Sequence, residues 1–126
     1  WKEFEENEIS HSATHYLFAI EELLISNGYA RAVDISKKLD ITPGSCSTGI
    51  KSLIKKGLIK EDENKFIKLT NYGEEIVKQI RKNRDLFTKF FMENLNVDEK
   101  NSVINACKIE HLIGAEITKA LEKYLK

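Results

Sequence analysis

The residues of this chain whose types and spacing could support chemistry are Cys107, Glu110 and His111. Positions i, i+3 and i+4 of a helix share one face, so a helix here would present a sulfur, an oxygen and a nitrogen donor together. Such a set can bind a divalent transition metal. A fourth donor must come from another segment: His15 is the best candidate, and His11, one helical turn earlier, is the reserve.

Spacing alone leaves other interpretations of these residues open. A buried cysteine often packs as a small hydrophobic residue, and a single histidine in a helix often packs or caps. Cys107 and His111 could also form a thiolate–imidazole pair for nucleophilic catalysis. The sequence shows no residue to orient that pair and no oxyanion hole, so we expect no enzyme.

The segments that must position these donors are mostly helical. Apolar residues recur at helical spacing over residues 9–26 and again over 32–39. In the second segment, Val33, Ile35 and Leu39 are the expected buried residues. The chain is therefore expected to be mainly α.

A third helix has the clearest start signal in the sequence. Thr42-Pro43 supplies a hydroxyl N-cap and a proline at the first helical position, and Gly57 ends the helix. Only Asp40–Thr42 separates it from the preceding helix, which predicts a helix-turn-helix.

After Gly57 the pattern changes to that of strands. Residues 58–60 and 66–69 are short apolar runs on either side of the polar turn 61–64, which predicts a β-hairpin. Three helices followed by a hairpin are the order of a winged helix-turn-helix. We therefore expect residues 1–72 to form a winged DNA-binding domain.

The rest of the chain predicts a helical dimerisation domain over residues 73–126. Its expected helices cover 71–94, 98–113 and 115–125, with Gly114 between the last two. Their apolar stripes exceed what a small winged domain can bury, so we expect a homodimer. An intramolecular three-helix bundle is the alternative.

Charge is distributed unevenly although the net charge is zero. Residues 28–70 carry nine basic and five acidic side chains, whereas residues 1–27 carry one basic and six acidic. A basic stripe of this kind suits double-stranded DNA. The residues expected to contact DNA are Arg31, Thr42, Pro43, Gly44, Ser45, Thr48, Lys51, Lys55 and Lys65.

From about Thr14 to its end, the chain resembles the diphtheria-toxin-repressor and manganese-transport-regulator family of metal-dependent regulators. The residues that carry the resemblance run through the whole region. They are Tyr16-Leu17, Gly28-Tyr29-Ala30-Arg31 with Asp34-Ile35, Thr42-Pro43-Gly44-Ser45, Lys56-Gly57-Leu58-Ile59, Leu69-Thr70-Asn71-Tyr72-Gly73, and Cys107-x-x-Glu110-His111.

The resemblance implies a metal-dependent transcriptional repressor. Its primary metal site would comprise His15, Cys107, Glu110 and His111, because the family has a ligand immediately before a tyrosine of the first helix. The ligand positions of a second site hold Asn83 and Val103, a carboxylate position holds Phe87, and another holds Phe18. A single site is therefore expected.

The donor set also bears on the metal and on the cell compartment. Thiolate and imidazole donors favour Fe(II), Zn(II) or Co(II) over Mn(II), and the resemblance, since iron sensing is common in the family, implies Fe(II) first, then Zn(II) or Co(II). Two distant cysteines fit a reducing cytoplasm, and no apolar run is long enough for a membrane span. The partner would be a palindromic operator. The alternative is a metal-independent winged-helix regulator that senses a small molecule, for which Phe87, Phe90 and Phe91 could line a pocket, or a protein.

Overall fold

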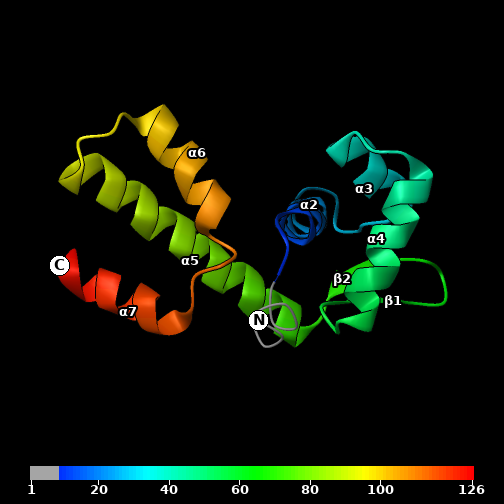
Figure 1. Cartoon of the computed structure of the whole chain (residues 1–126). Helices are drawn as coiled ribbons and strands as arrows, with labels where there is room; N and C mark the ends of the chain where they lie inside the picture. Colours follow the sequence, from blue (N-terminus) through cyan, green and yellow to red (C-terminus); the bar gives the residue numbers. More distant parts are fainter. Residues whose placement is uncertain (1–8) are drawn as a thin grey trace. The chain divides into compact units, whose positions relative to one another are not determined.

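A computed structural model of the chain describes residues 9–126. The elements follow in the order α2 (His11–Asn27), α3 (Ala32–Leu39), α4 (Pro43–Lys55), β1 (Ile59–Glu61), β2 (Ile67–Leu69), α5 (Asn71–Asn94), α6 (Glu99–Ile109) and α7 (Ala115–Tyr124) (Figure 1). The mainly α class with a winged helix-turn-helix is confirmed. Residues 1–8 of the first expected domain lie outside the described residues.

The described chain packs as two compact units, divided within α5 between Val77 and Lys78. One unit is Ser12–Val77, which holds the three N-terminal helices and the hairpin. The other contains Lys78–Lys126 together with the start of α2 up to His11.

The helix-turn-helix of the first unit forms as its sequence dictates. α3 ends at Asp40, which adopts left-handed backbone (φ 54°), and Ile41 N–H donates to the Ser36 carbonyl at 3.0 Å. α4 begins at Thr42, whose hydroxyl accepts from Ser45 N–H at 3.1 Å, with Pro43 in the first turn. The Tyr16 hydroxyl of α2 donates to the Ser45 carbonyl at 3.2 Å and so fastens α2 to α4.

Apolar residues from all elements close the core of this unit. Its fully buried members include Leu17, Ile20, Ile35, Leu53, Leu58, Ile59 and Ile67. The expectation for α3 is correct for Ile35 and wrong for Val33, which is 53% exposed. A helix of eight residues buries only a narrow stripe, and here Ile35 and Ser36 fill it.

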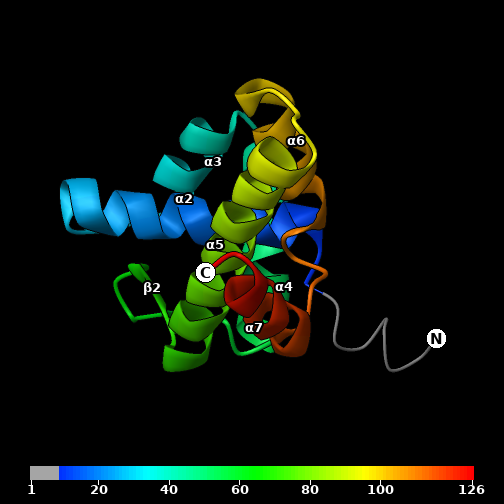
Figure 2. The same cartoon turned by 90° about the vertical axis from the view of Figure 1, so that its left-hand side faces the viewer.

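The hairpin is a two-stranded antiparallel sheet in which Ile59 lies opposite Leu69 and Glu61 opposite Ile67. Gly57 (φ 75°) supplies the left-handed turn between α4 and β1. The loop between the strands projects from the unit (Figures 1 and 2). It forms the wing that the change of period after Gly57 predicts.

In the second unit, α6 and α7 lie on opposite flanks of α5 (Figure 1). The Phe90 ring packs against that of Phe91 in the same helix, with centroids 6.2 Å apart, and against that of Tyr124 in α7, with centroids 6.1 Å apart. Helix α6 is shorter than the expected 98–113 and ends at Ile109. Among the described residues, no helix combines the length and apolarity required to cross a membrane.

Candidate metal centre and nucleic-acid interface

The expected metal ligands come from two places in the fold. Cys107 lies in the last turn of α6, Glu110 is the C-cap of that helix, and His111 follows in the turn. Glu110 keeps helical backbone (φ −54°, ψ −34°), so the i, i+3 relation to Cys107 survives although the helix has ended. His11 and His15 lie one turn apart on α2, and both are exposed.

Within the second unit the structure brings His11, Cys107 and His111 together. Ligand atoms of His11 and Cys107 lie within 4.8 Å of one another. The rings of His11 and His111 have centroids 5.5 Å apart. His15 offers a ligand atom within the same 4.8 Å of that of His11. A thiol and imidazoles grouped in this way suit a borderline-soft divalent ion.

Burial raises the pKa of the Cys107 thiol, and the nearby Glu110 carboxylate raises it further, against the opposing charge of Arg84. A thiol with a raised pKa carries its proton at neutral pH. Because only the thiolate is a good metal ligand, a metal bound by Cys107 would have to displace that proton.

Glu110, which is also among the expected metal ligands, is paired with an arginine. Its side chain is 1% exposed and forms a bidentate ion pair with Arg84 of α5, in which Nη2 donates to Oε1 at 2.8 Å and Nε donates to Oε2. The buried carboxylate is thereby neutralised. Sequence reasoning missed Arg84, since no spacing rule connects residues 26 positions apart.

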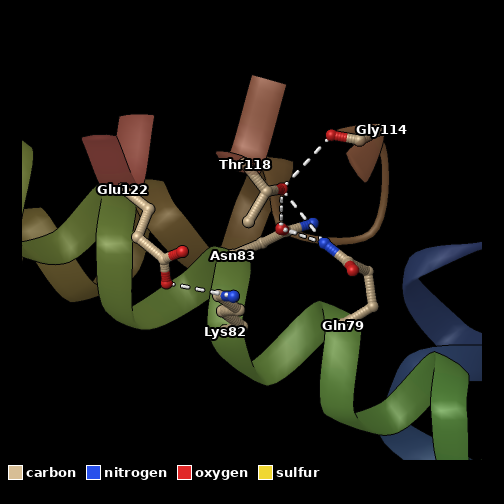
Figure 3. Close-up of polar contacts among 6 residues, drawn as sticks. All are labelled: Gln79, Lys82, Asn83, Gly114, Thr118 and Glu122. Atoms are coloured by element: carbon tan, nitrogen blue, oxygen red, sulfur yellow. Dashed lines mark hydrogen bonds and ion pairs between the residues drawn. The ribbon is translucent and has the colours of Figure 1, made fainter. Parts of the chain in front are cut away.

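The Asn83 side chain also has hydrogen-bond partners: two backbone carbonyls, the Thr118 hydroxyl and the Gln79 amide, of which Figure 3 shows the last two. Its amide nitrogen donates to the carbonyls of Glu110 (2.8 Å) and Ile113 (3.1 Å). Its amide oxygen accepts from Thr118 and, at 2.9 Å, from Gln79. Asn83 is 1% exposed and thus satisfies carbonyls that the end of α6 leaves open.

Replacing Asn83 with alanine should lower the free energy of unfolding by about 3 kcal/mol, because two carbonyls and Thr118 lose a buried partner. Metal stoichiometry should stay the same, since the amide is not among the donors. Urea unfolding and metal titration of the purified variant measure both quantities. Loss of bound metal from a folded variant would contradict the single-site expectation.

Val103 occupies one of the positions at which the family resemblance implies a ligand of a second metal site. Val103 lines a groove of about 340 Å³ whose α5 wall includes Arg84 and Thr88. Asn83 and Phe87 do not line it: Asn83 faces the turn after α6, and Phe87 contacts Phe91 with ring centroids 5.9 Å apart. The groove is also lined by Asp85 and Glu93 of α5, so carboxylates are present near Val103, but at positions other than those of Asn83 and Phe87.

Helix α4 presents the expected DNA-reading residues. Its exposed positions at the N-terminal end are Thr42, Pro43, Gly44, Ser45 and Thr48, followed by Lys51 and Lys55. The Thr48 hydroxyl donates to the Gly44 carbonyl at 3.1 Å, and the Thr42 hydroxyl donates to the Ser45 hydroxyl at 3.0 Å. Small polar groups on an exposed helix start suit approach to a groove.

Arg31 and Lys65 belong to the wing side of the same unit. The Arg31 guanidinium lies over the Phe66 ring, 4.3 Å from its centroid, and donates to the Asn64 carbonyl at 3.3 Å. Lys65 is exposed and pairs with Glu61 at 3.7 Å. Arg31 therefore fastens the wing to the start of α3 and still has an exposed side chain for a phosphate.

Comparison with known proteins agrees with this division of roles. Residues 15–60 match a winged helix-turn-helix DNA-binding family, and residues 70–126 match the metal binding and dimerisation domain of iron dependent repressors. An uncharacterized HTH-type transcriptional regulator of Methanocaldococcus jannaschii is 30% identical over 111 residues, covering 88% of this chain and 86% of that protein.

Two further proteins are similar over most of the chain. The HTH-type transcriptional regulator MntR of Lysinibacillus sphaericus is 32% identical over 90 residues, covering 71% of this chain and 64% of that protein. A solved structure of a hypothetical protein from Sulfolobus solfataricus superimposes with a TM-score of 0.81 at 26% identity, covering 93% of this chain and 89% of that one. With its winged N-terminal unit and its matched metal binding and dimerisation domain, the chain belongs to the diphtheria-toxin-repressor and MntR family of metal-dependent transcriptional regulators.

Proposed function

We propose that the chain is a repressor activated by one divalent transition metal ion, with His15, Cys107, Glu110 and His111 as ligands. The observation that carries the proposal is the grouping of the Cys107 thiol with the His11 imidazole, whose ring lies beside that of His111; Cys107 and His111 belong to the segment that matches an iron dependent repressor's metal-binding domain. His11 is the alternative to His15 as the ligand from α2, since the two lie one turn apart and both are exposed.

The donor set and the family together give the order of metals that we propose. One thiolate, two imidazoles and one carboxylate are softer than an oxygen-rich set, which favours Fe(II), Zn(II) or Co(II) over Mn(II). Fe(II) is placed first because the matched domain is that of iron dependent repressors. Asn83 and Val103 occupy the ligand positions of the second metal site, which supports one metal ion per chain.

The activated form that we propose is a homodimer on a palindromic operator in the cytoplasm. Apolar side chains of the second unit remain exposed on the described chain and would be covered by a second copy; they include Met92, Val103, Ile104, Leu112 and Ile117. Metal favours this form through higher affinity for the state in which ligands from α2 and from the end of α6 are assembled. The packing of Phe87, Phe90 and Phe91 with one another and with Tyr124 does not favour the small-molecule alternative.

The test is selection of genomic DNA fragments by the purified protein without oxygen, in Fe(II), Mn(II), Zn(II), Co(II) or chelator. Recovery of one palindromic sequence with metal only is the expected result, and the most effective ion ranks the metals. Recovery of the same sequence in chelator would contradict metal activation while keeping the winged-helix dimer.

Lys51→Ala tests the DNA surface at a residue of the winged unit that is not among the proposed metal ligands. Lys51 is exposed on α4, and one lost phosphate contact should weaken binding for all sequences and reduce the salt slope by about one. Fluorescence anisotropy at several salt concentrations measures the slope. Lys119→Ala is the control, because it removes the same charge from an exposed position of α7. A salt slope equal to that of wild type for Lys51→Ala would remove Lys51 from the interface.

A further inference from the structure

Arg84 and Glu110 form a bidentate ion pair between α5 and the end of α6. Both carboxylate oxygens of Glu110 accept from the guanidinium, and the carboxylate is buried, while 28% of the Arg84 side chain is exposed. A bidentate pair of this kind is stronger and more directional than an ordinary hydrogen bond.

Arg84 approaches from the side of the groove that Thr88 and Val103 line. The thiol of Cys107 lies one helical turn before Glu110 and within range of the Arg84 charge. A fixed positive charge thus stands beside two of the proposed metal donors. A divalent cation binding there would meet repulsion from it at short range.

We propose that Arg84 is an internal competitor of the metal ion, a guanidinium that holds Glu110 until metal displaces it and so sets the metal concentration at which the protein responds. This inference rests on the proposed function, because it concerns the same ligand set. Sensing is then an exchange of partners at one buried carboxylate. Cys107, His111 and the α2 histidine (His15, or His11 in its place) would bind first, and Glu110 would join when the Arg84 pair opens.

The test is anaerobic titration with Co(II), followed by its absorption bands, of the full chain and of Arg84→Gln. The glutamine removes the positive charge and keeps a hydrogen-bond donor for Glu110. Its Co(II) dissociation constant should fall at least tenfold below the wild-type value. Lys82→Gln is the matched control, because Lys82 lies on the same helix and loses only an exposed ion pair with Glu122 (3.0 Å); its dissociation constant should equal that of wild type.

Arg84→Lys is the second variant, because it keeps a positive charge beside Glu110 in case Arg84→Gln does not fold. Lysine neutralises the carboxylate but lacks the two-pronged fork, so its Co(II) affinity should lie between those of wild type and Arg84→Gln. Affinity at or below wild type in both folded variants would overturn the proposal and assign Arg84 to orienting Glu110. Failure of the wild-type protein itself to bind Co(II) would instead overturn the proposed function, and the inference with it.

Discussion

Replacing His111 with alanine is expected to abolish the metal-dependent gain in DNA affinity. The imidazole lies in the turn after α6, with its ring beside His11, and provides one of the nitrogen donors of the proposed site. An allosteric gain of this kind is typically about tenfold or more, and it should disappear because metal no longer distinguishes the two states of the protein. Affinity in chelator should stay at the wild-type level.

Fluorescence anisotropy with the selected operator, in Co(II) or Fe(II) and in chelator, measures this effect. Lys108→Ala is the control, since Lys108 is exposed in the same turn of α6 and offers no ligand of the proposed set. Glu110→Gln should lose the metal response too, but it also removes the partner of Arg84, so its unfolding must be followed in parallel. A metal response retained by folded His111→Ala would remove that residue from the site.

Gly73→Ala should lower the free energy of unfolding of the winged unit by at least about 3 kcal/mol, at the upper end of overpacking effects. A Cβ on Gly73 would lie 2.0 Å from the Leu58 carbonyl oxygen. That oxygen accepts from Thr70 N–H at 3.1 Å, and the Thr70 hydroxyl donates to the Gly57 carbonyl at 2.6 Å. Neither the start of α5 nor the start of the wing can move without breaking these bonds.

Chemical unfolding followed by circular dichroism measures the loss. Gly44→Ala is the control, because a Cβ there meets nothing within 4 Å and alanine favours the helix by up to about 1 kcal/mol. If Gly73→Ala unfolds at the same denaturant concentration as wild type, the close approach of α5 to Leu58 is wrong.

The elements were predictable from sequence where local signals are strong. Residues 32–39 and 71–94 were expected as helices and are helical with those bounds, because caps and apolar spacing act within a few residues. The hairpin was predictable for the same reason: a glycine with φ 75° and two short apolar runs define it locally.

The end of α6 was not predictable, because distant residues determine it. The sequence continues with helix-compatible residues to Ile113, but the carbonyls of Glu110 and Ile113 accept from Asn83 of α5. Tertiary partners thus replace the next turn of helix. The same limit applies to the candidate site: spacing identified Cys107, Glu110 and His111, whereas the Arg84 pair depends on how α5 packs against α6.

The small sheet of the wing also bears on how copies of this chain avoid associating wrongly. A two-stranded sheet consists of edge strands only, and such edges invite pairing with another chain. Here each strand has three residues, and the backbone N–H of Ile67 is taken by the Ala30 carbonyl at 2.8 Å. Lys60 and Lys68 lie opposite one another at the centre of the sheet and are both exposed. An approaching strand would meet two like charges and few open backbone groups, so the wing resists aggregation and leaves pairing between copies to the helices.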